Sequence, residues 1–225
     1  MKFEHIDHGF VFEELVATTT ESGRTYRVPK WGDFEDYESV TTVLNYDKKE
    51  FFEEWARTPG NKKKSEAAAH RGNIIHDAIE NYLNNVPDAF DVEDSEHRAM
   101  LGSMRPYLNK INNVHALEVP LYSHMMELAG RVDCVGEYEG VLSIIDFKGS
   151  TKTKKEEWIL NYFLQATAYS VMWEELTGQQ INQLVIIMGN EDGFCQIFKK
   201  DIREYVPLLF RHLMKYQQFK KQESK

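Results

Sequence analysis

The sequence GRVDCVGEYEGVLSIIDFKGSTK, residues 130–152, decides the fold. It contains two apolar stretches joined at Glu139-Gly140, a pair that is typical of a hairpin turn. Both stretches resemble core strands, yet three charged side chains interrupt them: Asp133, Asp146 and Lys148. The segment therefore predicts a hairpin of core strands that carries a charged cluster.

The spacing of these charges indicates how they face. Side chains alternate along a strand, so Asp146 and Lys148 are expected on one face, about 7 Å apart, and Phe147 on the other. A tight hairpin would bring Asp133 on the neighbouring strand close to Asp146. Two adjacent carboxylates repel each other and resist burial unless a cation joins them. A divalent metal with oxygen ligands would supply that cation, and the backbone carbonyl of Phe147 is a further candidate ligand.

Lys148 would then lie beside the metal. There its amine could orient an attacking water or stabilise the charge that grows on a phosphate. The alternative is an ordinary surface pair of Asp146 and Lys148 at the end of a strand, which would contribute little. The strand passes directly from an apolar core segment into a Gly-Ser-Thr loop, a place where functional sites are common, and this favours the metal site.

Elsewhere the chain reads as helices and strands without an internal repeat. Strands are expected over 115–123, 128–138, 141–148, 181–189 and 194–200, with a hairpin inside 9–31. Helices are expected over 47–55, 65–83, 95–112, 155–176 and 201–219. This order predicts an α/β fold, with helices packed around a central sheet.

We expect one domain over 1–225, in which 1–64 form a hairpin and helix elaboration and 65–225 form the core. Residues 33–38 read as a loose acidic stretch. Four residues are suited to begin or end helices: Ser39, Asp47, Gly178 and Asp201.

Composition limits the classes of function. The net charge of −9 argues against a basic protein that coats nucleic acid, but it allows a nuclease, whose site must be acidic to hold metal. Two cysteines are too few for a four-cysteine zinc site or an iron–sulfur cluster, so buried free thiols are expected. No apolar run approaches the roughly 18 residues of a membrane span, and no signal-peptide pattern opens the chain. These features predict an intracellular protein without a membrane partner.

The charged hairpin also resembles a known family. Asp133, a short hairpin and then Asp146-Phe147-Lys148 resemble the Asp…(Asp/Glu)-x-Lys signature of the PD-(D/E)XK nucleases. Three more segments, in the family's order, are similar to its RecB-like branch. They are Arg71–Glu80 (Gly-x-x-x-His-x-x-x-Glu), Gln165–Tyr169 (Gln-x-x-x-Tyr) and Tyr37–Leu44, the last similar to the Ser-Val-Thr segment of mitochondrial genome maintenance exonucleases and related phage exonucleases.

The resemblance implies a restriction-endonuclease-like core of a helix, a three-strand meander, a helix and a strand. It further implies that Asp133 and Asp146 bind metal, with His76 as an additional ligand, and that Lys148 is the catalytic lysine. Mg²⁺ is the expected ion, with Mn²⁺ as a substitute. The loop after the lysine departs from the family's frequent Lys-Thr-Ser, because Gly149 follows Lys148 here.

Further site residues follow from the same resemblance. Gln165 and Tyr169, four apart on one helix face, would support the site or contact DNA. Glu118, on the strand before Asp133, would hold a second metal or a water on the metal. Taken alone, His76 would be read as a packed or exposed helix residue, and Tyr169 as a core residue.

Three hypotheses remain open at this point. The preferred one is a Mg²⁺-dependent DNA exonuclease acting on single-stranded ends in replication, recombination or repair. A phage origin, and thus a bacterial host cytoplasm, comes from the resemblance. The second is a structure-specific endonuclease with the same site, and the third is a non-catalytic module that binds nucleic acid or protein. Acidic surface patches leave room for a replication or recombination partner. The N-terminal hairpin and Lys62–Lys64 could shape a passage for a strand.

Overall fold

The computed structural model describes residues 2–223. The strands are β1 (Val16–Thr20), β2 (Gly23–Lys30), β3 (Asp33–Ser39), β4 (Ile111–Ser123), β5 (Leu128–Tyr138), β6 (Val141–Ser150), β7 (Gln183–Asn190) and β8 (Cys195–Asp201). The α-helices are α1 (Val40–Leu44), α2 (Lys49–Arg57), α3 (Asn61–Leu83), α4 (Ser95–Leu108), α5 (Leu160–Thr177) and α6 (Ile202–Glu223). Short 3₁₀ turns cover Tyr46–Lys48 and Glu156–Trp158.

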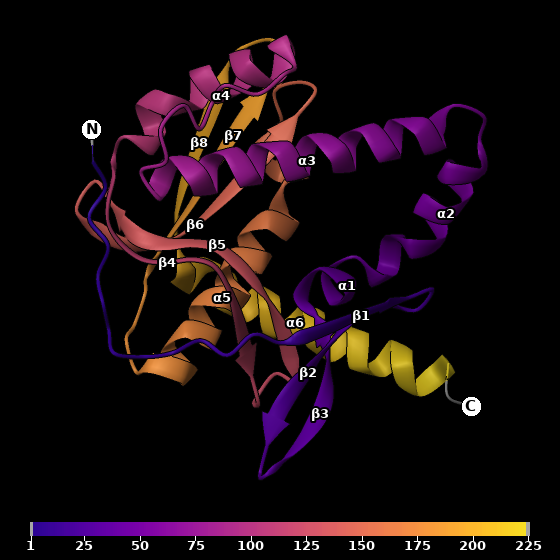
Figure 1. The fold of residues 1–225 in the computed structure, drawn as a ribbon. Coiled ribbons are helices and arrows are strands. Elements are labelled where there is room, and N and C mark those ends of the chain that lie inside the picture. The colour runs from indigo at the N-terminus through magenta and orange to yellow at the C-terminus, as the bar shows by residue number, and fades with distance from the viewer. Residues whose placement is uncertain (1, 224–225) are drawn as a thin grey trace.

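The strands form one mixed sheet. β4, β5 and β6 make an antiparallel meander, β6 pairs in parallel with β7, and β7 pairs antiparallel with β8. On the other side, β1, β2 and β3 form an antiparallel unit that joins β5 through a short parallel pairing of β3. The β2–β3 hairpin extends away from the helices (Figure 1).

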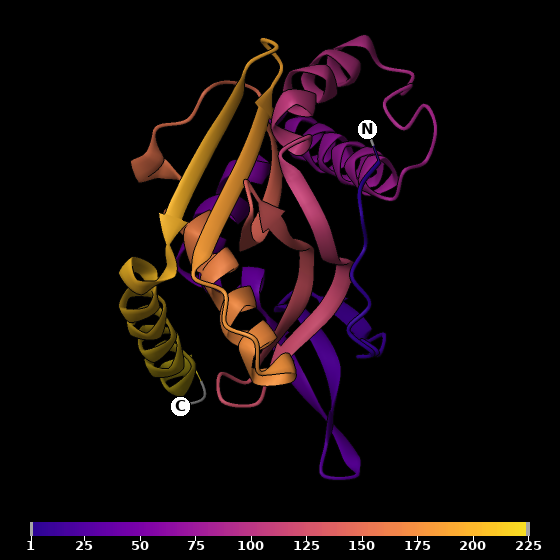
Figure 2. The same cartoon turned by 90° about the vertical axis from the view of Figure 1, so that its left-hand side faces the viewer.

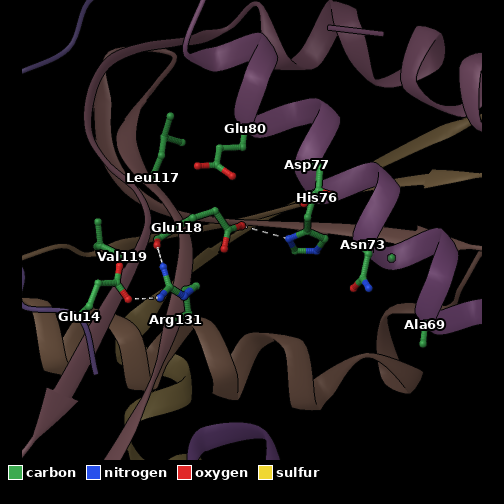
Figure 3. A pocket seen from close by; sticks show the side chains of 11 residues that line it. Glu14, Ala69, Asn73, His76, Asp77, Glu80, Leu117, Glu118, Val119 and Arg131 are labelled. Atoms are coloured by element: carbon green, nitrogen blue, oxygen red, sulfur yellow. Dashed lines mark hydrogen bonds and ion pairs between the residues drawn. The ribbon is translucent and has the colours of Figure 1, made fainter. Parts of the chain in front are cut away.

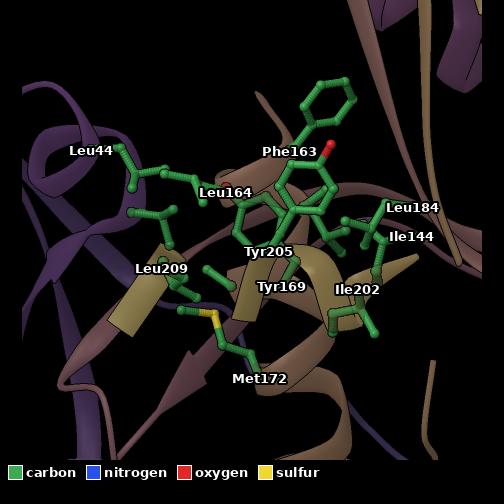
Figure 4. Packing of buried hydrophobic residues seen from close by; sticks show 14 of the residues in the cluster. Leu44, Ile144, Phe163, Leu164, Tyr169, Met172, Leu184, Ile202, Tyr205 and Leu209 are labelled. Atoms are coloured by element: carbon green, nitrogen blue, oxygen red, sulfur yellow. The ribbon is translucent and has the colours of Figure 1, made fainter. Parts of the chain in front are cut away.

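Helices cover the two faces of this sheet, with α3 and α4 on one face and α5 and α6 on the other (Figures 1 and 2). Each face has its own apolar cluster. The cluster on the α5 side joins that helix to α1, α6 and the sheet, as Figure 4 shows for Leu44, Tyr169 and Leu209. The cluster on the α3 side includes Ile79 and Phe147.

The predicted α/β core, with its meander between helices, is confirmed. The caps at Ser39, Gly178 and Asp201 are also present: the Ser39 hydroxyl accepts the N–H of Thr42, Gly178 is left-handed, and Asp201 accepts the N–H of Arg203.

Other local predictions are wrong. Residues 33–39 form β3 rather than a loose stretch, because they pair with β2 along its length. Lys48, not Asp47, occupies the N-cap position of α2, since a 3₁₀ turn precedes that helix. The helix predicted over 95–112 ends at Leu108, and the one predicted from 155 begins at Leu160. Cys134 is buried, whereas Cys195 is partly exposed.

β5 changes partners along its length. Its pairing with β6 ends at Cys134 opposite Ile145, and its first residues, Leu128 and Ala129, pair with β3 instead. β6 meanwhile continues beside β7 as far as Ser150. The sheet therefore opens between β5 and β6 just beyond Cys134, where the charged residues of the hairpin begin.

Tyr169 of α5 packs into this opening against Gly130 of β5. A Cβ atom at position 130 would lie 2.8 Å from both Cε1 and the hydroxyl oxygen of Tyr169. Tyr169 is buried, so its ring has little room to retreat. Only glycine at position 130 leaves space for the tyrosine there.

We expect Gly130→Ala to lower the free energy of unfolding by about 1–3 kcal/mol, because it overpacks a buried contact. Gly102→Ala is the matched control: Gly102 lies inside α4, and a methyl group added there would meet no atom within 4 Å, so alanine should stabilise by up to about 1 kcal/mol. Urea unfolding of both variants measures the difference. Equal stabilities would contradict the close contact with Tyr169.

No helix within residues 2–223 is both long and apolar enough to cross a membrane.

Candidate metal centre

Three ligand side chains from three elements converge at the opening in the sheet. His76 comes from α3, Glu118 from β4 and Asp133 from β5, and one ligand atom of each lies within 4.8 Å of the others. His76 Nδ1 is 3.3 Å from Glu118 Oε1 and 3.7 Å from Asp133 Oδ1. Residues that are 42 and 57 positions from His76 in the chain thus meet it at one point.

The backbone explains why Asp133 and Glu118 point there. Asp133 would be opposite Asp146 in the register of β5 and β6, but the ladder ends one pair earlier. The carboxylate of Asp133 instead accepts the N–H of Phe147 at 2.8 Å and takes the place of the missing backbone partner. Glu118 has a φ of 48°, a left-handed conformation that non-glycine residues rarely adopt.

The conformation of Glu118 coincides with a change of face in the β4–β5 pair. Leu117 and Cys134 are opposite each other and pack on the α3 side of the sheet. Val119 and Val132, two positions further along the ladder, pack in the cluster on the α5 side. Residues two apart in a regular strand share a face, so the strands turn over at Glu118 and Asp133.

Asp146 and Lys148 form an ion pair next to these ligands, in which Asp146 is buried and Lys148 is partly buried. The Lys148 amine donates to Asp146 Oδ1 at 2.6 Å and lies 5.2 Å from the centre of the Tyr162 ring of α5. Phe147, on the other face of the strand, packs in the apolar cluster on the α3 side, as strand alternation predicts. Asp146 is only 1% exposed, and its Oδ2 has no hydrogen-bond partner among the described residues.

Burial and the neighbouring charges shift the pKa values of both members of the pair. Burial raises the pKa of Asp146 to about 6, and the charge of Asp133 acts in the same direction against the opposing effect of Lys148. Burial lowers the pKa of Lys148, but the charges of Asp146 and Asp133 outweigh this effect and raise it overall. Lys148 therefore stays protonated at neutral pH.

His76 responds to the same carboxylates. Burial lowers its pKa, but the charge of Asp133 and the hydrogen bond to Glu118 outweigh that effect and raise the pKa to about 9. Without a metal ion, the carboxylates are therefore balanced by the proton on His76 and by the amine of Lys148. An imidazole nitrogen with carboxylate oxygens, and a buried carboxylate oxygen without a partner, fit a divalent cation.

Two of the three ligands, His76 and Glu118, line a cleft of about 820 Å³, shown in Figure 3. Its wall is acidic, since Glu14, Asp77 and Glu80 line it together with Glu118. Burial raises the pKa of Glu80, and the charges of Glu118 and Asp77 add to that effect. An acidic cleft of this kind can receive a phosphodiester only if cations neutralise its carboxylates.

Arg131 is the only arginine or lysine in the wall of this cleft among the described residues. Its guanidinium donates to the backbone carbonyl of Glu118 and to the carboxylate of Glu14 (Figure 3). Sequence reasoning missed Arg131 and Glu14. Arg131 lies two residues before Asp133, but the strand turns over at Asp133, so strand alternation alone would not have revealed it. Glu14 is 117 residues from Arg131, and no local pattern points to it.

Gln165 and Tyr169 lie on one face of α5, with Gln165 Nε2 3.4 Å from the Tyr169 hydroxyl. Tyr169 is buried, and burial together with the charge of Asp133 raises its pKa. Tyr169 packs against Gly130 of β5, and its side chain is buried. This position suits a role in supporting the site rather than in contacting DNA. The N–H of Phe147 is bonded to Asp133; a role for the carbonyl of Phe147 stays a prediction.

The fold and the site together define a class: an α/β protein with a three-strand meander between helices, whose carboxylates, histidine and lysine meet where two strands separate. The family model described as the PD-(D/E)XK nuclease superfamily matches residues 93–206. The chain belongs to this superfamily, and its core is of the restriction-endonuclease-like type.

Known relatives are similar to this protein over part of its length. Mitochondrial genome maintenance exonuclease 1 of Mus musculus is 30% identical over 128 residues, which are 55% of this chain and 37% of that protein. The Homo sapiens protein of the same name is 30% identical over 131 residues, with the same shares covered. The chain thus matches little more than a third of the length of these relatives.

A solved structure from Eubacterium rectale, whose exonuclease activity is only presumed in its name, superposes with a TM-score of 0.41 at 12% identity. The superposition covers 66% of this chain and 68% of the other. A likeness of this size carries no argument about function.

Proposed function

We propose that this protein is a metal-dependent DNA exonuclease that hydrolyses phosphodiester bonds from single-stranded ends, with Mg²⁺ as its ion and Mn²⁺ as a substitute. The observation that carries the proposal is the meeting of His76, Glu118 and Asp133 within 4.8 Å, beside the Asp146–Lys148 ion pair. Membership of a nuclease superfamily supports it.

His76, Asp133 and Asp146 would hold the ion, with Glu118 beside them. When bound, the ion would polarise the phosphate and lower the pKa of the attacking water. The protein's own contribution is to place the other groups. Asp133 is fixed by the N–H of Phe147, so its second oxygen faces His76.

Lys148 supplies a fixed positive charge. Because its pKa is raised, it acts as a hydrogen-bond donor and a cation, and not as a base. Held by Asp146, its amine would orient the water and stabilise the charge that grows on the phosphate oxygens. The water oxygen forms a bond to phosphorus as the bond from phosphorus to the leaving oxygen breaks. The attacking water loses a proton to solvent, the leaving oxygen takes one up, and no covalent intermediate with the protein is formed.

The preference for an end rests on the named relatives and on the shape of the N-terminal half. The chain leaves the sheet through α1 and α2 and returns to it along α3, whose first half extends away from the sheet (Figure 1). Residues 62–70 of α3 are all exposed, and Lys62–Lys64 are among them. A strand passing beside this exposed helix would find positive charge there. Replication, recombination or repair in a phage-infected bacterial cytoplasm, with a protein partner from one of those processes, is the setting we propose.

The test is digestion of DNA with labelled ends. We expect linear single strands to be shortened in Mg²⁺ or Mn²⁺ and to stay intact in chelator, while circular single strands of the same sequence persist. Asp146→Asn is the inactive control. Cleavage of the circles would make the protein a structure-specific endonuclease with the same site. Binding without any cleavage would favour the non-catalytic module.

A further inference from the structure

A second hollow adjoins the metal cleft. It has a volume of about 260 Å³ and lies on the outer face of the β1–β3 unit. Its lining residues come from that unit and the segment before it: Glu13, Glu14, Leu15, Val16, Arg27, Pro29 and Phe34. Glu14 lines both this hollow and the metal cleft, so the two are neighbours on the surface.

The hollow presents a partly exposed aromatic ring with a cation above it. Phe34 is 57% exposed, and the Arg27 guanidinium lies 5.2 Å from the centre of its ring. Pro29 is opposite Phe34 in the β2–β3 ladder, and Val16, opposite Arg27, is 68% exposed. The other face of this unit is buried through Tyr26, whereas the outer face carries the hollow.

Arg131 lies between the hollow and the metal ligands. It bonds to the carbonyl of Glu118 on one side and to Glu14 on the other, as Figure 3 shows. Its side chain is 38% exposed, and that of Glu14 is 72% exposed. A phosphate could replace the Glu14 carboxylate on Arg131 at little cost, because exposed ion pairs are weak.

We propose that a single strand of nucleic acid bound at the metal centre continues past Arg131 and places a base in this hollow, stacked on Phe34 beside Arg27. The position of the strand at the metal rests on the proposed function. Two features of the hollow favour a nucleic acid as the occupant: its cation and ring suit a base, and it adjoins the cleft where the metal ligands His76 and Glu118 lie. Stacking of this kind accepts any base, since every base has a flat apolar face.

The experiment measures binding of a fluorescent oligothymidylate by anisotropy in Ca²⁺, with the full chain. Phe34→Ala is expected to weaken binding about 10- to 100-fold, the range of one stacked base. Phe34→Trp should restore it. Trp31→Ala is the matched control, because Trp31 is on the same hairpin and 95% exposed but does not line the hollow. Thermal unfolding of each variant verifies that it is folded.

An abasic oligonucleotide separates base stacking from phosphate contact. Wild type should bind the abasic strand about as weakly as Phe34→Ala binds the normal one, and Phe34→Ala should show no further loss. The proposal is overturned if Phe34→Ala binds oligothymidylate as wild type does, or if Trp31→Ala weakens it equally. A protein occupant would give the first of these results.

Failure of the proposed function would look different. If no DNA is cut but binding still depends on Phe34 and on the base, the base site stands and the exonuclease activity does not. If DNA is cut at the wild-type rate and affinity is unchanged in Phe34→Ala, only the base site is overturned.

Discussion

Asp146→Asn should lower metal-dependent DNA cleavage by about 10³-fold or more. A metal ion contributes several kcal/mol to stabilising the charge of a phosphoryl transition state, and each 1.36 kcal/mol is tenfold in rate. Asparagine keeps the size of Asp146 and removes the charge that would hold the ion and Lys148 in place. Release of labelled nucleotides under single-turnover conditions measures the loss.

Loss of folding is the competing explanation for an inactive Asp146 variant. Asp146→Asn leaves the partly buried amine of Lys148 without its ion-pair partner, which is expected to destabilise the fold. The double variant Asp146→Asn/Lys148→Met removes both charges, so in chelator it should be at least as stable as wild type. It should also be as inactive in DNA cleavage as Asp146→Asn. Cleavage at more than a tenth of the wild-type rate by either variant would show that Asp146 does not hold the ion.

The difference in stability between the wild type and the double variant should depend on pH. Asp146 has a pKa of about 6 in the folded protein and an ordinary value of 3.8, so folding disfavours its ionised form. The wild type should therefore lose stability relative to the double variant as the pH rises from below 4 through about 6. The raised pKa of Lys148 leaves its contribution constant over that range. Chemical unfolding in chelator at pH 4, 5, 6 and 7 measures the difference.

Divalent cations should stabilise the folded protein. A ligand at 100 times its Kd contributes about 2.7 kcal/mol, which for a chain of this size raises Tm by about 5–10 °C. Mn²⁺ at saturation should produce this rise without any DNA present. Asp133→Asn should eliminate it, because asparagine can still accept the N–H of Phe147 but brings no charge to His76 and Glu118.

Asp77→Asn is the control for this measurement. Asp77 lines the same cleft and is the neighbour of His76 on α3, but it is not one of the three converging ligands. Its variant should keep most of the Mn²⁺ effect. If Asp77→Asn and Asp133→Asn lose it equally, the cation is held by the general acidity of the cleft and not by the three-residue cluster.

Several features of this protein could be predicted from short stretches of sequence. The β5–β6 hairpin, the common side of Asp146 and Lys148, and the caps at Ser39 and Gly178 depend only on residues a few positions apart. Strand alternation and hydrogen bonds at helix ends are local geometry, so the local pattern is enough. The four motifs that resemble the nuclease family added the prediction that His76 joins the site.

The tertiary structure alone decided how the distant parts meet. The left-handed backbone at Glu118, the change of face beside it and the end of the β5–β6 ladder bring Glu118 and Asp133 to His76. β3 became a strand because β2 and β5 offered it hydrogen bonds, against its acidic composition. Arg131 meets Glu14 across 117 residues. Such contacts depend on which strands pair and where a helix packs, and no periodicity within one segment contains that information.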